Sequence, residues 1–121
     1  MNRTELSKHV LDKYSIVGER PWQKYPSYEV FRHNDNKKWF AVVMRIPMSK
    51  LGVLENREVN VVNLKCTPEV LDELRQEEGI YPAYHMNKEH WISVLLDGSV
   101  SPEAIKTLLD VSYNATKKKW Y

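Results

Sequence analysis

Residues 39–44, WFAVVM, constrain the fold more than any other segment, because they place six apolar residues in succession. A strand with one solvent-exposed face alternates apolar and polar side chains, whereas this strand has to bury both faces. Such a strand lies inside a sheet, with helices over one face and a different layer over the other. Residues 28–33 and the turn at 34–37 come directly before it, which predicts an antiparallel hairpin whose second strand is 38–46.

Two further strands are predicted downstream of this hairpin. Residues 57–65 contain the adjacent apolar pair Val61 and Val62, which indicates either a bulge or burial on both faces. Residues 90–96 form an apolar run that Asp97 and Gly98 close with a turn. Upstream of the hairpin, an extended crossing is predicted whose aromatic side chains pack on the sheet edge. It is marked by Pro21, Trp22, Tyr25 and Pro26.

Three helices are predicted, each from a capping side chain followed by apolar residues at helical spacing. Thr4 caps the first helix. Its buried stripe consists of Leu6, Val10, Leu11 and Tyr14. Thr67 and Ser101 each precede a proline and begin the second and third helices. The second helix runs to about residue 78, with Val70 and Leu71 pointing inward. The order of elements predicts one α+β domain over residues 1–121, with a mainly antiparallel β-sheet and helices packed on one face.

Length and composition indicate a small protein with one core and no membrane span. The chain has 121 residues, of which 42% are hydrophobic, and this is enough to bury a real core. It has no apolar run of about eighteen residues and no secretory leader, so we expect a cytoplasmic protein. The lone Cys66 excludes an internal disulfide and is interpreted as a small buried residue. We expect a monomer.

Charge is divided unevenly along the chain. Residues 1–65 hold 12 Lys and Arg against 7 Asp and Glu, whereas residues 66–116 hold 3 against 9. Lys117, Lys118 and Lys119 then suit the end of the last helix, where cations meet the negative end of the helix dipole. The division predicts a molecule with a basic side and an acidic side. Two ordinary solvated faces are the alternative explanation.

The segment from Gly79 to Gly98 is the densest in side chains that could carry recognition. A possible anion or ligand loop consists of Tyr84, His85, Asn87, Lys88 and His90. The two histidines lack the helical face or cysteine pair of a metal site, so we expect no metal. We assign no catalytic residue and no cofactor, because no nucleophile has a positioned partner and no glycine loop could cradle a phosphate. The structural alternative is that these side chains satisfy the backbone of a tight loop and fill the core edge.

A series of marks in one order along nearly the whole chain resembles the MmcQ/YjbR family. They are Lys38 to Ala41, Leu64 and Lys65, Thr67 and Pro68, Pro82 to His85, Asn87 and Lys88, His90 and Trp91, Leu96 to Gly98, and Ser112 with Tyr113. The resemblance implies a CyaY-like (frataxin-like) fold and a DNA-binding role through two β-hairpin wings, and it brings no catalytic residues. On this sequence the wings are the turn at residues 34–38 and the loop at residues 48–57. Iron handling does not follow, because the likeness to frataxin is one of fold only.

Under this hypothesis, cations on the wings and on the ligand loop contact DNA or another polyanion. The residues assigned to this contact are Arg32, Lys37, Lys38, Arg45, Lys50, Arg57, Lys65 and Lys88. No predicted helix carries the Arg, Asn and Gln cluster of a major-groove reader, so we expect weak, salt-sensitive binding with little sequence preference. Two alternatives stay open: the cations are ordinary solvated strand ends, or residues 84–91 form a small-anion or protein-binding module. We expect no enzymatic activity.

Overall fold

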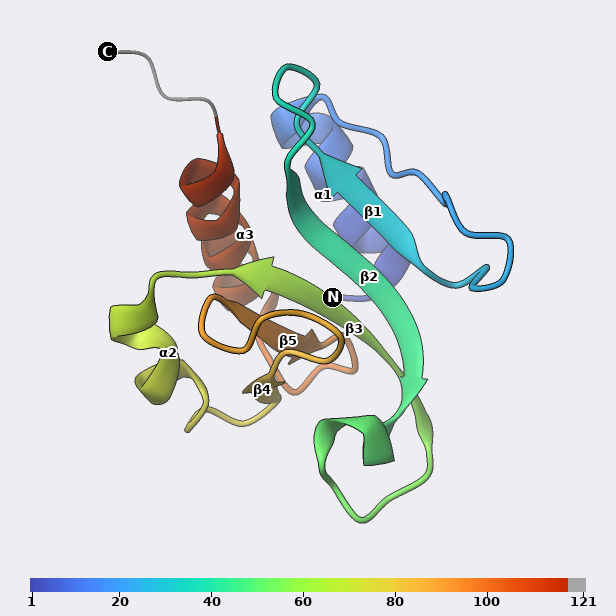
Figure 1. Cartoon of the computed structure of the whole chain (residues 1–121), viewed down its shortest axis with the longest axis vertical. Helices are drawn as coiled ribbons and strands as arrows, with labels where there is room; N and C mark the ends of the chain where they lie inside the picture. The colour runs from blue at the N-terminus through green and yellow to red at the C-terminus, as the bar shows by residue number, and fades with distance from the viewer. Residues whose placement is uncertain (118–121) are drawn as a thin grey trace.

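Residues 1–117, the part of the chain that the computed structural model describes, form one five-stranded antiparallel sheet and three α-helices (Figure 1). Lys118 and Lys119, which we expected at the end of the last helix, lie outside the described residues. The strands are β1 (Glu29–Arg32), β2 (Trp39–Pro47), β3 (Glu58–Lys65), β4 (Ile80–Pro82) and β5 (Trp91–Leu95). Their order in the sheet is β1-β2-β3-β5-β4. The helices are α1 (Arg3–Tyr14), α2 (Pro68–Leu74) and α3 (Pro102–Thr116), with a 3-10 turn, η1 (Met48–Leu51), after β2.

Helices α1 and α3 cover one face of the sheet, which confirms the predicted α+β architecture (Figure 1). Leu6 and Val10 of α1 are fully buried in one cluster with Ile105 and Leu109 of α3 and with Val62 of β3. Burying an aliphatic side chain completely contributes roughly 1.5–3 kcal/mol. This helix-side layer is therefore a main source of stability.

The opposite face of the sheet, which we call the loop-covered face, carries a second hydrophobic layer. Its buried residues include Val30, Val42, Met44, Val59, Val61 and Leu95. They alternate along β2 and β3 with residues of the helix-side layer, and side chains from three connecting segments pack over them. The continuous apolar run of β2 is thus buried on both faces, as predicted. For Val61 and Val62 the second of the two predicted alternatives holds, because both are buried and the register with β2 is continuous.

A β-bulge between β1 and β2 decides which side chains of β2 reach which layer. Phe31 pairs with Ala41 and Arg32 pairs with Trp39, so Phe40 is the extra residue. Phe40 and Ala41 consequently both join the helix-side layer, while Trp39 borders the loop-covered face. No sequence pattern had indicated a bulge at this position.

Ser112 of α3 completes the hydrogen bonding beside this bulge. Its hydroxyl donates to the carbonyl oxygen of Phe40 at 2.5 Å and accepts from the backbone nitrogen of Lys65 at 2.9 Å. The side chain is fully buried, and a buried backbone group without a partner costs about 1–3 kcal/mol. One hydroxyl therefore joins β2, β3 and α3.

The first helix begins earlier than predicted. Asn2, not Thr4, is its N-cap: the Asn2 side chain accepts from the backbone nitrogen of Glu5, and the Glu5 carboxylate accepts from that of Asn2. Leu11, which we assigned to the buried stripe, is 49% exposed. The reciprocal capping box fixes the helix start two residues ahead of the position that Thr4 alone suggested.

The second helix is shorter than predicted, and an unpredicted strand follows it. Helix α2 ends at Leu74 rather than near residue 78, and Val70 is 37% exposed instead of buried. Thr67 occupies the N-cap position, but its side chain makes no capping hydrogen bond. Strand β4 has only three residues, and a segment that short leaves no periodic pattern in the sequence.

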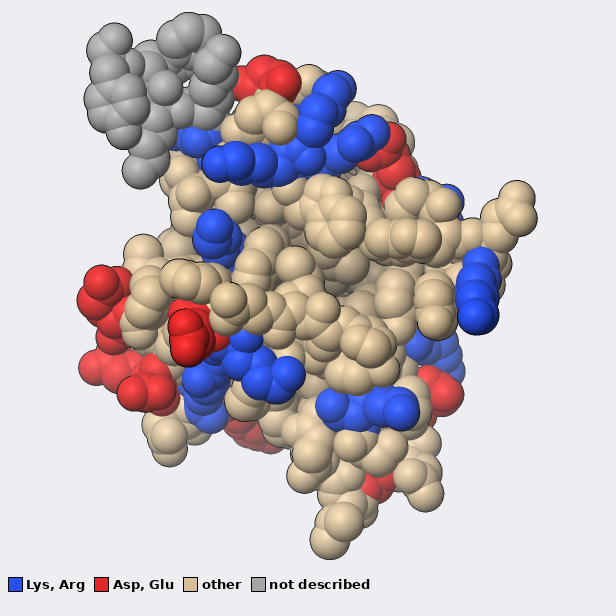
Figure 2. Space-filling view, viewed as in Figure 1, with Lys and Arg blue, Asp and Glu red and all other residues tan. Residues whose placement is uncertain are grey.

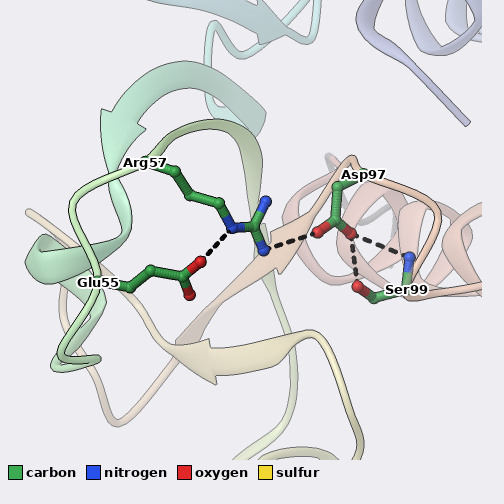
Figure 3. A network of polar contacts seen from close by, with 4 residues as sticks. All are labelled: Glu55, Arg57, Asp97 and Ser99. Carbon is green, nitrogen blue, oxygen red and sulfur yellow. Dashed lines mark hydrogen bonds and ion pairs between the residues drawn. The ribbon is translucent and has the colours of Figure 1, made fainter.

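A polar clasp joins the loop after η1 to the turn after β5 (Figure 3). Nε of Arg57 donates to a carboxylate oxygen of Glu55 at 2.7 Å, and its Nη2 lies 3.4 Å from a carboxylate oxygen of Asp97. Asp97 also accepts from the backbone nitrogen and the hydroxyl of Ser99, at 2.9 and 2.6 Å. Burial by itself would raise the pKa of Asp97, but the hydrogen bonds from Ser99 and Arg57 lower it. The clasp therefore holds its charges at neutral pH.

Candidate binding pocket on the loop-covered face

A pocket of about 350 Å³ opens on the loop-covered face, between an aromatic wall and the loop that joins β4 to β5. The wall consists of Trp22, Tyr25, Tyr28 and Trp39. Asn63 of β3 lines the pocket together with His85 and Met86 of the β4–β5 loop, and Val42 and Met44 of β2 complete the lining. We call this space the aromatic pocket.

The aromatic wall is fixed by packing of ring against ring. Trp22 lies edge-to-face against Tyr28 and Trp39, with ring centroids 6.2 and 5.7 Å apart and interplanar angles of 88° and 81°. Tyr25 stacks on Tyr28 at 5.0 Å. Each such pair contributes about 0.5–1.5 kcal/mol beyond its buried area. Burial raises the pKa of Tyr28, and the neighbouring Tyr84 and Tyr25 add to the rise, so its hydroxyl stays neutral at physiological pH.

Local hydrogen bonds shape the segment that carries this wall. The backbone nitrogen of Tyr25 donates to the carbonyl of Trp22 at 3.2 Å, and that of Tyr28 donates to the carbonyl of Tyr25 at 3.0 Å. The Arg20 guanidinium closes the second turn by donating to the carbonyl of Pro26 at 2.9 Å. Two successive turns thus bring side chains from residues 22, 25 and 28 to one side of the chain.

Asn63 and Ser93 anchor the β4–β5 loop over the sheet. They are paired in register on β3 and β5, and both are fully buried. The Ser93 hydroxyl donates to Oδ1 of Asn63 at 2.5 Å and accepts from the backbone nitrogen of Tyr84 at 3.0 Å. Nδ2 of Asn63 donates to the carbonyl of Tyr84 at 2.8 Å. Two polar side chains inside an apolar layer therefore hold both backbone groups of Tyr84.

His85 is the member of the predicted ligand loop that reaches the pocket. Its backbone has a φ of +63°, an uncommon conformation for a residue other than glycine, and its ring lies 3.8 Å from that of Tyr84. The Asn63 anchor on the preceding residue holds this conformation in place. The imidazole is exposed and borders the pocket, where it can stack on or hydrogen-bond to a ligand.

The remaining loop residues lie outside the pocket lining. Oδ1 of Asn87 accepts from the backbone nitrogen of Glu89 at 2.7 Å, and its carbonyl accepts from those of His90 and Trp91 at 3.2 and 2.9 Å. Asn87 therefore has the loop-stabilising role that we weighed as the structural alternative. Lys88 is exposed, and its carbonyl accepts from the Arg75 guanidinium.

The structure does not gather the eight predicted DNA-contacting cations into one patch. Arg32 forms an ion pair with Glu19 at 2.6 Å, and Arg57 is held in the clasp. Arg45 follows Val43 by two residues along β2, which places it on the helix-covered face.

The two predicted wings lie at opposite ends of β2 (Figure 1). Lys37 and Lys38 belong to the turn before this strand, and Lys50 belongs to η1 after it. A nine-residue strand rises roughly 30 Å, so the wings stand about that far apart.

Three of the assigned cations lie within two residues of the lining of the aromatic pocket along the chain. Lys38 directly precedes Trp39, Lys65 follows Asn63 by two residues on the same face of β3, and Lys88 lies in the β4–β5 loop. Among the described residues, none of these lysines takes part in an ion pair. In Figure 2, Lys and Arg side chains lie at several separate places around a central uncharged area. Three lysines close in sequence to the pocket lining are therefore without an ion-pair partner among residues 1–117.

The arrangement of metal-ligating side chains and the burial of the lone cysteine bear on the chemistry that the described residues can carry. Within residues 1–117, no group of three or more His, Cys, Asp or Glu side chains is arranged to hold a metal ion. Cys66 is 2% exposed, and burial raises the pKa of its thiol although Arg75 opposes the rise.

No helix in the described part of the chain is long and apolar enough to cross a membrane.

A second polar cluster joins α1 to α3 on the other side of the sheet. The Tyr14 hydroxyl donates to Asp110, and Nζ of Lys13 lies 2.6 Å from the same carboxylate. Burial raises the pKa of Tyr14, and the bond to Asp110 raises it further. These residues therefore serve as a link between helices at neutral pH.

Sequence reasoning placed Trp22 and Trp39 in structural roles and overlooked Asn63. The signal for Asn63 is an amide inside the otherwise apolar strand VNVVNLK, with Ser93 at a similar place in WISVL. Buried polar side chains on neighbouring apolar strands indicate a polar network, because neither would be tolerated without a partner. This signal was available in the sequence.

The fold and the pocket define a class of small α+β proteins in which helices cover one face of an antiparallel sheet and aromatic loop segments cover the other. The sequence matches the YjbR family over residues 11–115, and the chain belongs to this family, as its motifs predicted.

Relatives and a solved structure extend this similarity over almost the whole chain. The sequence is 43% identical over 117 residues to the uncharacterized protein YyaQ of Bacillus subtilis, which covers 97% of this chain and 99% of YyaQ. It is 38% identical over 89 residues to the uncharacterized protein YjbR of Escherichia coli, covering 73% and 74% of the two chains. The crystal structure of a Pseudomonas syringae protein has a TM-score of 0.94 and 46% identity, covering 97% of this chain and all of that chain.

Proposed function

We infer that the protein is a non-enzymatic binding domain that holds DNA, or another polyanion, against its loop-covered face. The observation that carries this proposal is the aromatic pocket together with three lysines that lie within two residues of its lining and form no ion pair among the described residues, Lys38, Lys65 and Lys88. Aromatic rings offer surfaces on which bases stack, and cations around them neutralise phosphates. Single-stranded nucleic acid combines both features, because its bases are free to leave the stack.

The double-wing mode is the second way in which the same chain could hold DNA. With the wings roughly 30 Å apart at the two ends of β2, one duplex would have to run along the strand for on the order of nine base pairs. Lys37, Lys38 and Lys50 would then contact phosphates at separate places. This mode predicts preference for duplex, whereas the aromatic face predicts preference for a single strand.

A small-anion or protein-binding role of residues 84–91 is the alternative function. Its support is the rigid display of His85, whose left-handed backbone and contact with Tyr84 hold the imidazole at the surface. Lys88 is exposed three residues before β5 begins and could add a positive charge. We place the binding activity in the cytoplasm and assign it to a monomer; the lone, buried Cys66 is in keeping with a reducing compartment.

Fluorescence anisotropy with a labelled single strand and the matching duplex tests the proposal. We expect the single strand to bind more tightly, and its affinity to fall as salt rises from about 50 to 200 mM, because each neutralised phosphate releases counterions. Lys38→Glu and Lys65→Glu should each reduce the slope of log affinity against log salt by about 1. Lys8→Glu is the matched control, because Lys8 lies exposed on α1 and pairs with Asp12. Equal loss in all three variants, or no binding at low salt, would refute the proposal.

A further inference from the structure

The aromatic pocket has the dimensions and walls for one planar ring system. Its volume of about 350 Å³ is at the small end of the range of roughly 300–1,000 Å³ for ligand pockets. Trp22 and Tyr28 line it from the segment before β1, Trp39 from the start of β2, and His85 and Met86 from the β4–β5 loop. A flat aromatic ligand would therefore find π surfaces or soft apolar atoms around it, and a bulky or extended ligand would not fit inside.

Asn63 fixes one part of the pocket lining. Its amide donates to the Tyr84 carbonyl and accepts from the Ser93 hydroxyl. The side chain is fully buried, so these bonds set the shape of the pocket before a ligand arrives, and the ligand itself meets the surrounding rings.

The charges around the pocket distinguish two ligands that aromatic rings can hold, a quaternary ammonium cation and a ring that carries a phosphate. Trp22 and the two rings perpendicular to it, Tyr28 and Trp39, could also cage a quaternary ammonium group by cation–π attraction. The residues that line this pocket include no carboxylate, and Lys38, Lys65 and Lys88 each lie within two residues of a lining residue along the chain. A cationic ligand would be repelled by these lysines, whereas a ring that carries a phosphate would be attracted. The charge pattern therefore favours a nucleotide.

On the basis of the proposed function, we propose that the aromatic pocket holds one unpaired nucleobase between its rings, while the phosphate of that nucleotide meets the neighbouring lysines. The base comes from a single strand or from a free nucleotide. The inference deepens the nucleic-acid proposal by naming a base-binding site, and it can fail while that proposal stands.

Titration of the ¹⁵N-labelled protein with adenosine monophosphate, ribose 5-phosphate and choline tests the base site directly. We expect adenosine monophosphate to shift the indole and amide signals of Trp39, Asn63 and His85, and ribose 5-phosphate and choline to bind at least about tenfold more weakly. Trp39→Ala should weaken the nucleotide about tenfold or more, while Trp39→Phe should retain most of the affinity. Leu54→Ala is the control, because Leu54 is fully exposed outside the pocket. Equal affinity for ribose 5-phosphate, or tighter binding of choline, would overturn the inference.

A strand with an abasic position separates this inference from the proposed function. In a short adenine strand, replacing the bases by abasic sites should weaken binding about tenfold or more and remove the pocket shifts. If the abasic strand binds as tightly as the intact one, the base site is refuted and phosphate binding stands. If adenosine monophosphate shifts the pocket but no strand binds, the base site stands and the polyanion proposal is refuted. If neither nucleotide nor strand binds, both are refuted.

Discussion

Removing the Ser93 hydroxyl should loosen the β4–β5 loop and destabilise the protein by a predictable amount. Ser93→Ala leaves Oδ1 of Asn63 and the backbone nitrogen of Tyr84 without their partner in the second hydrophobic layer. A buried polar group left unpaired costs about 1–3 kcal/mol. The nitrogen of Tyr84 is only partly buried, so we expect the free energy of unfolding to fall by about 2–4 kcal/mol in total. That is a large share of the roughly 5–15 kcal/mol typical of a domain.

Urea unfolding measures this loss, and a double-mutant cycle shows where it originates. With an m-value of about 2 kcal/mol/M, the midpoint should fall by roughly 1–2 M. Asn63→Ala and the double variant should show a coupling energy of about 0.5–3 kcal/mol, because the two side chains share one network. Ser49→Ala, an exposed serine in η1, should change stability by no more than about 0.5 kcal/mol. A loss below about 0.5 kcal/mol for Ser93→Ala, with additive effects in the cycle, would refute this account of the loop.

Two further variants test polar groups of the helix-side layer. Ser112→Ala should lower the free energy of unfolding by about 2–5 kcal/mol, because it leaves the Phe40 carbonyl and the Lys65 nitrogen unpaired; a urea midpoint equal to that of the wild type would contradict this. His33 is buried with Nε2 2.8 Å from the Thr116 hydroxyl, and burial lowers its pKa although Asp35 and the backbone at Tyr113 oppose the shift. The unfolded chain therefore takes up the proton first: the stabilisation is complete above about pH 6.5 and is lost as pH falls through the lower pKa of the folded state. His33→Gln should flatten the dependence of the urea midpoint between about pH 8 and 5, and an unchanged slope would show that His33 is not responsible.

The architecture was predictable where a pattern extends over many residues. The apolar run of β2 required burial on both faces, and the order of caps, strands and helices gave the α+β arrangement. Competition between two possible caps caused the error at the first helix. Thr4 is a good capping residue, but Asn2 and Glu5 form a reciprocal capping box that starts the helix earlier. Strand β4 stayed hidden because three residues that contain Pro82 carry too little periodicity.

The pocket was less predictable than the sheet, because it depends on contacts between distant segments. Its wall combines two turns after α1 with the start of β2, and neither the direction of Trp22 nor the orientation of Trp39 follows from local sequence. The ligand loop stays a prediction, and of its five assigned residues only His85 lines the pocket. The cations were individually recognisable, yet only the fold shows that Arg57 is held by two carboxylates and that Arg45 lies on the far face.

The extra residue in β2 allows two consecutive side chains to enter the helix-side layer while Trp39 stays at the pocket. Phe40 and Ala41 both face the helices, and Trp39 pairs with Arg32. Deleting Phe40 would restore simple alternation and leave Trp39, now next to Ala41, on the loop-covered face, so the aromatic wall would keep its second tryptophan while the helix-side layer lost a fully buried phenylalanine. Insertions in residues 48–57 leave both layers in place, because that loop can lengthen without changing the register of either strand. A designer who wishes to graft or resize binding segments on this scaffold can therefore edit the loop freely, whereas a deletion at the bulge affects the core and not the pocket.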